Sequence, residues 1–412
     1  MKCATRARPR DDKARIVTWD AWAAGEAETI RAAQRWRAPR DLDGRGPQTT
    51  IAADGRPVIS FASNDYLGLT THPSVISAAH DAIDRWGTGA GSARLIVGSR
   101  PVHSELEREL AAWKEAERAA LFPTGFAANL GVLTTFGTAG VLICSDELNH
   151  ASIIDGCRLA AADVAVYRHR DLDHLRALLR DHGDRRALVV SDTVFSMDGD
   201  TADIAALTEL CAQERALLVL DEAHAVLGPT VEAGAGADAN LLRIGTCSKT
   251  LGALGGFVAG PRRFVELVEN SSRPYIFTTA PTPADAAAAL AALRVLRSAE
   301  GDALVARLRA NVDRIRPGHP SPILPFLCGE EQRAVEDAAT MLTYGIVVPA
   351  IRPPTVAPGT SRLRVALSAA HTDEHMDRLV AALAAVFPGP ASPANPPARP
   401  AAAERSGATA PA

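Results

Sequence analysis

The stretch Leu217-Leu218-Val219-Leu220-Asp221-Glu222-Ala223-His224 joins a short apolar run to a carboxylate and, three residues later, to an imidazole. An apolar run of this length, ended by polar residues, is typical of a strand that is buried on both faces of a parallel sheet. Ligands of such α/β sheets bind beyond the carboxyl ends of the strands. The stretch therefore predicts an α/β fold with Asp221 at the edge of a binding site.

Similar apolar runs recur on both sides of this stretch. They occur at residues 141–145, 164–168, 187–194, 241–246 and 256–259, and helical patterns at residues 151–162, 172–181 and 203–213 lie between several of them. Strands that alternate with helices indicate a mostly parallel sheet covered by helices on both faces.

The flanking sequence predicts further elements and a division into domains. We expect an amphipathic helix at 20–38, two short strands at 50–61 and one long helix at 282–310, followed by a strand at 321–328, a helix at 330–344, strands at 346–351 and 362–368 and a helix at 372–387. The chain is thus expected to comprise an N-terminal segment (1–60), a cofactor-binding large domain (61–285), a smaller α+β C-terminal domain (286–387) and a disordered Pro/Ala/Ser-rich tail (388–412).

Composition narrows the classes of function. A net charge of −4 over 412 residues gives no electrostatic reason to expect nucleic acid or an anionic membrane as a partner. The six cysteines show no C-x-x-C spacing, which favours reduced thiols over a zinc site or a disulfide framework. We see neither a signal peptide nor an apolar run long enough to cross a membrane. The expected location is the cytoplasm, and no metal site is expected.

Lysine is scarce, because only four of the 44 basic residues are lysines. One of them, Lys249, follows an apolar run in Gly245-Thr246-Cys247-Ser248-Lys249-Thr250-Leu251-Gly252 and precedes a glycine-rich turn. Small, uncharged neighbours suit an amine that forms an imine with a cofactor aldehyde, whereas the alternative is an ordinary lysine of a surface loop. Lys114, within a helix expected at 105–117, is interpreted as solvated.

The letters Asp221-Glu222-Ala223-His224 also spell the D-E-A-H box of nucleotide-binding ATPases. Such an ATPase requires a G-x-x-x-x-G-K-[ST] phosphate loop, normally earlier in the chain. The Lys249-Thr250 pair lacks the required glycine and lies downstream of the box. This alternative is therefore disfavoured.

A carboxylate together with an imine-forming lysine suggests pyridoxal 5′-phosphate (PLP), whose pyridine nitrogen is kept protonated by an aspartate such as Asp221. The turn Thr124-Gly125-Phe126-Ala127-Ala128-Asn129 opens a predicted helix, and its amides at Gly125 and Phe126 are candidates to bind the phosphate. His150 follows a strand and is a candidate to stack on the ring. A surface or capping role for His150 remains open.

The chain resembles the α-oxoamine synthases, which are fold-type I PLP-dependent transferases. Eight motifs carry the resemblance in family order: Ser63–Leu69, Gly87–Ser92, Phe122–Asn129, Asn149–Ser152, Phe195–Asp200, Asp221–His224, Thr246–Lys249 and Ile351–Thr355. Together they cover roughly residues 30–387. The resemblance implies a fold-type I architecture, with a large domain on a mostly parallel sheet and a smaller α+β C-terminal domain.

The resemblance also implies a role for each matching residue. Lys249 would bind the cofactor covalently and act as the catalytic base, Asp221 would pair with the pyridine nitrogen, His224 would bind the phenolic oxygen and His150 would stack on the ring. The remaining cofactor contacts would be Gly125, Phe126, Ser196 and Thr246, with Thr278 or Thr279 supplied by the other subunit of a homodimer. Arg352 would bind the amino-acid carboxylate, and Arg35 and Thr355 would lie toward the acyl substrate.

Within this family the chain most resembles the members of biotin biosynthesis. The implied reaction is a decarboxylative condensation of L-alanine with pimeloyl-CoA, or with a pimeloyl carrier protein, to give 8-amino-7-oxononanoate, CO2 and the free thiol. Glycine C-acetyltransferase, 5-aminolevulinate synthase and serine palmitoyltransferase share the catalytic residues and remain alternatives. A cofactor-binding scaffold without turnover is disfavoured, because every expected catalytic position is filled.

Overall fold

The computed structural model describes residues 18–231 and 240–388, and nearly all of the expected tail lies outside this range. The chain forms two compact units, one within Met1–Ala62 and Pro325–Val365 (unit 1) and the other within Ser63–Leu324 and Ala366–Ala412 (unit 2). The expected boundary at 285/286 does not separate these units. The reason is long-range strand pairing, because β3 (Pro57–Ser60) pairs in parallel with β12 (Ile346–Val347) and so joins the N-terminal segment to a distant part of the chain.

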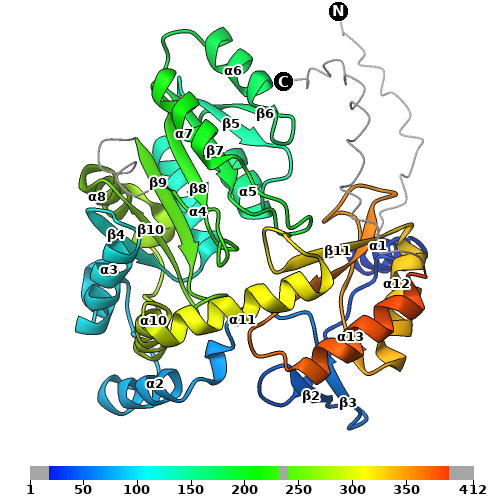
Figure 1. Ribbon diagram of the computed structural model, residues 1–412. Coiled ribbons are helices and arrows are strands. Elements are labelled where there is room, and N and C mark those ends of the chain that lie inside the picture. The colour runs from blue at the N-terminus through cyan, green and yellow to red at the C-terminus, as the bar shows by residue number, and fades with distance from the viewer. Residues whose placement is uncertain (1–17, 232–239, 389–412) are drawn as a thin grey trace, which may run out of the picture. The chain divides into compact units, whose positions relative to one another are not determined.

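Unit 2 is built on a sheet of seven strands, shown in Figure 1. In spatial order they are β4 (Arg118–Phe122), β10 (Gly256–Gly260), β9 (Leu241–Thr246), β8 (Leu217–Asp221), β7 (Ala187–Asp192), β5 (Leu142–Asp146) and β6 (Asp163–Tyr167). The pairings β6–β5, β5–β7, β7–β8 and β8–β9 are parallel, and β10 runs antiparallel to both β9 and β4. The mostly parallel α/β sheet expected from the apolar runs is confirmed.

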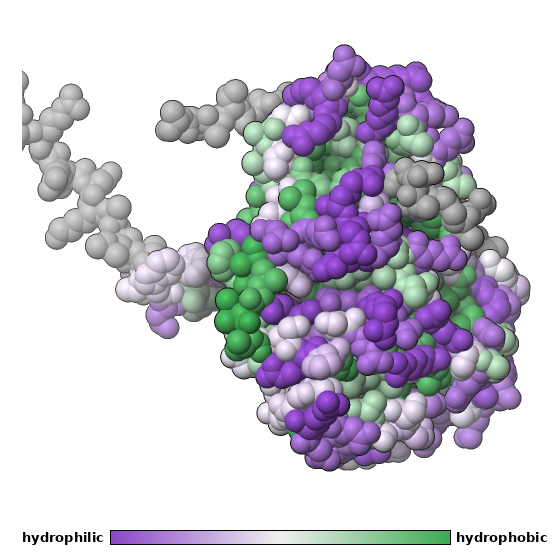
Figure 2. Space-filling view, turned by 90° about the vertical axis from the view of Figure 1, so that its left-hand side faces the viewer, coloured by the Kyte–Doolittle hydropathy of each residue, from purple (hydrophilic) through white to green (hydrophobic). Residues whose placement is uncertain are grey.

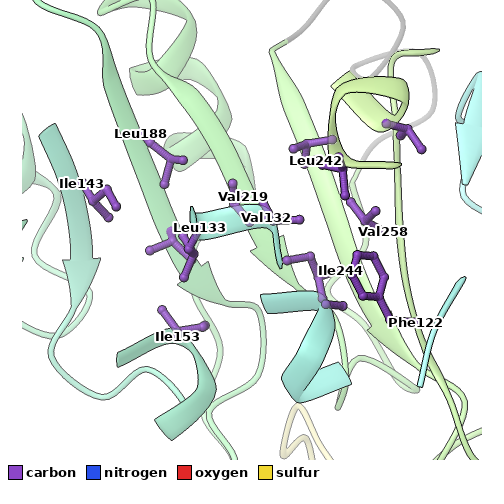
Figure 3. Close-up of a cluster of buried hydrophobic side chains, with 14 of the residues drawn as sticks. Phe122, Val132, Leu133, Ile143, Ile153, Leu188, Val219, Leu242, Ile244 and Val258 are labelled. Carbon is purple, nitrogen blue, oxygen red and sulfur yellow. The ribbon is translucent and has the colours of Figure 1, made fainter. Parts of the chain in front are cut away.

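Helices cover both faces of this sheet. Side chains of α4 (Gly125–Phe136), α5 (Ala151–Leu159), α8 (Arg262–Ser271) and α9 (Arg273–Ile276) pack on one face, and Figure 3 shows Val132, Leu133 and Ile153 against Ile143, Leu188 and Val219 of the strands. Side chains of α6 (Leu172–Asp181) and α7 (Ile204–Gln213) pack on the other face, against Cys144, Val189 and Leu218. Successive strand residues alternate between the two clusters, as the pleat requires. We call these the α4/α5 face and the α6/α7 face.

The remaining α-helices described in unit 2 are α2 (Pro73–Trp86), α3 (Pro101–Trp113), α10 (Pro283–Leu296), α11 (Ala299–Ile315) and α13 (Asp373–Val386). The single helix expected over 282–310 is wrong, because the chain breaks between α10 and α11. Ser298 adopts an extended conformation there (φ −112°, ψ 171°) and precedes two acidic residues in the first turn of α11. Serine at a helix start followed by acidic residues is a start signal that the continuous Ala/Leu pattern hid.

Unit 1 contains two small sheets. One has the order β1 (Leu42–Asp43), β2 (Gln48–Ile51), β3, β12, and the other the order β11 (Ile323–Gly329), β14 (Ser361–Ala366), β13 (Ala350–Ile351). The single strand expected at 346–351 is therefore two strands in different sheets, with Pro349 between them. Proline has no N–H to donate to a ladder and so interrupts the pairing. The helices of unit 1 are α1 (Trp19–Ala32), which is shorter than expected, and α12 (Glu331–Thr343).

Within 18–231 and 240–388, no helix is both long and apolar enough to cross a membrane.

Candidate active site

The predicted catalytic residues follow the carboxyl ends of three parallel strands of unit 2. His150 lies four residues after the end of β5, Asp221 is the last residue of β8, and Lys249 lies in the connection from β9 to β10. Because parallel strands end at one edge of the sheet, these distant parts of the sequence come together.

A hydrogen-bonded chain runs from the half-buried Lys249 to the half-buried Asn64. Lys249 Nζ lies 2.8 Å from His224 Nε2, and His224 Nδ1 lies 2.6 Å from the Tyr66 hydroxyl. That hydroxyl donates to Asn64 Oδ1 at 3.1 Å, so its oxygen accepts from His224 Nδ1. His224 is therefore held with hydrogen on Nδ1 and a lone pair on Nε2, which accepts from Lys249. Tyr66 is fully buried and belongs to the motif Ser63–Leu69, for which the sequence predicted no individual role.

A second chain joins Asp221 to His150. Asn129 of α4 donates through Nδ2 to Asp221 Oδ2 (2.7 Å) and to Ser152 Oγ (2.9 Å). Ser152 in turn lies 2.7 Å from His150 Nδ1, which also accepts from the Ser152 amide at 3.2 Å. His150 thus caps α5, and its Nδ1 lone pair is occupied. Desolvation by the surrounding protein lowers the pKa of His150, which agrees with a neutral ring.

Asp192, which sequence reasoning missed, lies beside Asp221. The two are register partners in the parallel β7–β8 pair, and Asp192 Oδ2 accepts the backbone amide of His150 at 2.7 Å. Burial, followed by repulsion from the Asp221 carboxylate, raises the pKa of Asp192 well above its usual range. The sequence does carry a signal, because Asp192 is the last residue of β7 as Asp221 is the last residue of β8. The run 187–194 continues past Asp192, which conceals this strand end.

The start of α4 offers free donors next to Thr246. The helix begins at Gly125, with Ala128 N–H donating to Thr124 O (3.1 Å) and Ala127 N–H donating to Thr124 Oγ1 (3.0 Å). The amides of Gly125 and Phe126 precede these bonds and remain available to an anion. A Cβ on Gly125 would lie 3.3 Å from Thr246 Cβ, so the predicted phosphate contacts Gly125 and Thr246 are neighbours.

The other predicted cofactor contacts in unit 2 lie on loops. Ser196 is half-buried in the turn after β7. Thr278 is half-buried and Thr279 exposed, and Thr279 forms an isolated antiparallel bridge with Ala93 of the same chain. Their assignment to a second subunit stays a prediction.

The three predicted substrate contacts belong to unit 1. Arg352 donates to the backbone carbonyls of Gln34 and of Trp36, the latter at 3.3 Å, and burial lowers its pKa. Arg35 forms an ion pair with Glu331 at 2.8 Å, and Thr355 is exposed in the turn after Arg352. Their roles toward substrates stay predictions.

The interpretation of Lys114 as a solvated helix residue is wrong. α3 ends at Trp113, and Lys114 is a buried C-cap residue whose Nζ lies 2.7 Å from Glu222 Oε2. Arg243 Nε lies 2.7 Å from the other oxygen of Glu222. Burial lowers the pKa of Lys114, whereas the two cations lower the pKa of Glu222 although burial alone would raise it. Glu222, the second letter of the D-E-A-H run, thus forms part of a structural ion-pair cluster.

Comparison with known proteins gives the family. The sequence profile of the aminotransferase class I and II family matches residues 56–383. The chain belongs to this family. Within it, the 8-amino-7-oxononanoate synthase of Anaeromyxobacter dehalogenans is 46% identical over 389 residues, which cover 90% of this chain and 97% of the relative.

Solved structures agree with the family and with the fold-type I architecture. A lysine-to-alanine variant of a serine palmitoyltransferase from S. paucimobilis, solved with a bound PLP–myriocin aldimine, superposes with a TM-score of 0.81 at 28% identity, covering 89% of this chain and 97% of that one. The 8-amino-7-oxononanoate synthase of Francisella tularensis superposes with a TM-score of 0.66 at 26% identity, covering 80% and 96%. The fold-type I transferase expected from the motifs is confirmed.

Proposed function

We propose that this chain is a PLP-dependent acyltransferase that condenses L-alanine with a pimeloyl thioester and releases 8-amino-7-oxononanoate, CO2 and the thiol. The observation that carries the proposal is the convergence of the two hydrogen-bonded chains, one ending on Lys249 and the other joining Asp221 to His150, in a protein 46% identical to an 8-amino-7-oxononanoate synthase.

The residues present fit PLP. Lys249 offers an amine held by His224, and the α4 start offers the amides of Gly125 and Phe126 to a phosphate. Asp221 lies at the end of β8 with Oδ2 fixed by Asn129, which suits a charged partner for a pyridine nitrogen. When bound, PLP would take up the electron pair that is left on the α-carbon of the amino acid.

The protein groups then bind, orient and move protons. Lys249 would remove and return the α-proton, and the neutral ring of His150 would stack on the cofactor without competing for its charge. His224 would accept the hydrogen of the phenolic oxygen at Nε2, the atom that faces Lys249 here. Ser196 and Thr246 would add hydroxyl contacts. These roles rest on the resemblance and on the placement of each side chain in unit 2.

Arg352 would bind the carboxylate of the amino acid, because a planar guanidinium matches a carboxylate with two parallel bonds. Its two Nη atoms now hold backbone carbonyls at 34 and 36, and its buried Nε has no partner among the described side chains. Arg35 and Thr355 would lie toward the acyl thioester.

A second candidate is another α-oxoamine synthase, and one observation favours it. The backbone superposes better on a serine palmitoyltransferase, with a TM-score of 0.81, than on the Francisella 8-amino-7-oxononanoate synthase, with 0.66. Sequence identity favours the first proposal, at 46% against 28%. Because specificity depends on side chains that line the pocket, identity carries more weight than backbone superposition.

The proposed assembly is a homodimer that acts in the cytoplasm and contributes Thr278 or Thr279 to the partner's cofactor site. The short helix Arg94–Gly98 exposes Ile96 and Val97 by 72% and 69%, and Phe277, next to Thr278, is 70% exposed. The bridge between Ala93 and Thr279 brings these two segments together. On the face shown in Figure 2, hydrophobic residues gather in a dense patch at the left of the view. Exposed apolar clusters of this kind are typical of subunit interfaces.

The test is product identification. The purified holoenzyme is incubated with alanine, glycine or serine and with pimeloyl-, acetyl-, succinyl- or palmitoyl-CoA, and the products are identified by mass spectrometry. Alanine with the pimeloyl thioester is expected to exceed glycine with acetyl-CoA by more than tenfold in kcat/KM, a difference of about 1.4 kcal/mol. A preference for serine with palmitoyl-CoA would establish the second candidate instead.

A further inference from the structure

His169 lies between two carboxylates at the carboxyl end of the sheet. Its Nδ1 is 2.9 Å from Asp146 Oδ1 and its Nε2 is 2.8 Å from Asp200 Oδ2. An ionised carboxylate only accepts hydrogen bonds, so both ring nitrogens must carry hydrogen and the ring is a cation. Burial alone would lower the pKa of His169, but the hydrogen bonds to Asp146 and Asp200 raise it to about 9.

The surroundings of the ring complete this ion-pair cluster, which we call the His169 clamp (Asp146, His169, Arg170 and Asp200). The Arg170 amide donates to Asp146 Oδ2 at 2.9 Å, and Arg170 Nη1 lies 3.3 Å from Asp200 Oδ2. The His169 amide donates to Glu147 Oε1 at 2.9 Å, and the ring meets Phe195 edge-on at 4.4 Å between centroids. Within the described part of the chain, no group of histidine, cysteine and acidic side chains is placed to hold a metal ion.

The clamp joins two loops that present predicted cofactor contacts. At one end, Asp146 closes β5, accepts the Leu148 amide at 2.9 Å and accepts the Asn149 amide at its carbonyl, one residue before His150. At the other end, Asp200 closes a turn through its carbonyl, which accepts the Phe195 amide at 3.0 Å. This turn contains Ser196.

The clamp lies away from the cofactor side of the sheet. Along β5, Asp146 follows the alternation of Leu142 and Cys144, which face α6 and α7, whereas Asp221 follows Val219, which faces α4 and α5. Any effect of His169 on the chemistry must therefore pass through the two loops.

We propose that His169 is a positioning residue whose imidazolium, held between Asp146 and Asp200, fixes the loops that present His150 and Ser196 to the cofactor. This inference rests on the proposed function, because it assigns those two side chains to the PLP site. Deprotonation of the ring leaves one carboxylate facing a nitrogen lone pair. The hydrogen bond to that carboxylate is then lost, and the loop that it held becomes more mobile.

The experiment uses the holoenzyme of the wild type and of His169→Gln, with His80→Gln as the matched control because His80 is exposed on α2. Two quantities are measured from pH 7 to pH 10: the visible circular dichroism per bound PLP, which reports how the protein orients the cofactor, and kcat. The wild-type ellipticity and kcat are expected to fall together with a midpoint near 9. His169→Gln is expected to have lost at least half of both at pH 7 and to show no such transition. His80→Gln is expected to follow the wild type.

Asp200→Asn tests the same clamp from its other end, in case His169→Gln folds poorly. Loss of one carboxylate is expected to move the midpoint to lower pH by about one unit or more, because a nearby negative charge stabilises the protonated ring. Wild-type ellipticity and kcat in His169→Gln, with only the melting temperature lowered, would reduce the clamp to a structural cross-link and overturn the proposal. A wild-type protein that binds no PLP would overturn the proposed function itself, an outcome that the cofactor band distinguishes at once.

Discussion

The Tyr66 hydroxyl lies 2.6 Å from His224 Nδ1 and decides which nitrogen of that ring carries hydrogen. Because Tyr66 also donates to Asn64, it can only accept from His224, and Nε2 is left to accept from Lys249. The buried Tyr66 thus makes the His224 nitrogen that faces the Lys249 amine a hydrogen-bond acceptor.

Tyr66→Phe is expected to free Nδ1 and so to let hydrogen move to Nε2. A hydrogen bond of this kind contributes about 0.5–1.5 kcal/mol, so the PLP dissociation constant should rise roughly two- to tenfold. Equilibrium dialysis measures the constant, and nitrogen NMR of His224 reports the tautomer. Tyr344→Phe is the control, because Tyr344 is 46% exposed. Unchanged nitrogen shifts in Tyr66→Phe would show that Tyr66 does not set the tautomer.

Replacing Lys249 is expected to abolish turnover, whereas replacing Lys114 is expected to lower stability. Lys249→Ala should lose turnover and bind PLP weakly, with its melting temperature preserved. Lys114→Met should keep the cofactor but lose about 3–5 kcal/mol of unfolding free energy, because it leaves part of the buried Glu222 charge uncompensated. Borohydride reduction followed by peptide mapping locates the adduct, and urea unfolding measures stability. An adduct on Lys114 would refute the assignment of both residues.

Lys114 also shows what local sequence patterns can and cannot predict. Strands β5 to β10 and helices α5, α6 and α7 of unit 2 were predictable because each is specified by its own apolar spacing, whereas β4, α2, α8 and α9 were not predicted. Asp221, His224, Lys249 and His150 lie within four residues of a strand end. The Lys114–Glu222 pair joins residues 108 positions apart, and the sequence around Lys114 carries no trace of it.

The same limit explains the other omissions. The sequence predicts no role for Asn129, because its bond to Asp221 spans 92 residues. His169 lies in a polar connection, and its role depends on two aspartates that are distant in sequence and adjacent only after the sheet forms. The division into units 1 and 2 was not predicted for a related reason, since β3 pairs with a strand almost 290 residues later. Local patterns specify elements, whereas polar networks depend on topology.

Arg352→Lys is expected to weaken alanine binding. Losing a bidentate charge-assisted pair costs about 1.5–3 kcal/mol, so KM for alanine should rise roughly ten- to a hundredfold while PLP binding is unchanged. Arg35→Gln is the matched control, because it removes a neighbouring guanidinium of unit 1 that pairs with Glu331. It should spare alanine binding and lower kcat/KM for the thioester. An unchanged KM for alanine in Arg352→Lys would exclude the proposed role.

Gly256→Ala is expected to disturb the phosphate end of the site. The added Cβ would lie 2.4 Å from Gly125 N and from Thr124 O, so β10 and the start of α4 must separate. Overpacking of this kind costs about 1–3 kcal/mol, and PLP affinity should fall with it. Calorimetry and PLP titration measure the two effects. Gly25→Ala on α1 is the control, since its Cβ would meet nothing within 4 Å. A Gly256→Ala protein with wild-type PLP affinity would show that β10 and the start of α4 can separate without weakening PLP binding.

The stability of the protein is expected to fall as pH rises from neutral to alkaline values, and His169 is expected to account for a definable part of the fall. Its pKa is raised from 6.5 to about 9 in the folded protein, so the folded state holds a proton that the unfolded state releases. The contribution is therefore complete below about pH 6.5 and disappears as pH passes through about 9, and it amounts to roughly 3 kcal/mol at most.

Urea unfolding at several pH values measures this contribution in the wild type, His169→Gln and His80→Gln. Other groups titrate in the same range, so the difference between wild type and variant is the informative quantity. His169→Gln should be less stable than the wild type at pH 6.5 and nearly equal to it at pH 10, whereas a constant difference at all pH values would mean that the ring is not charged in the folded protein.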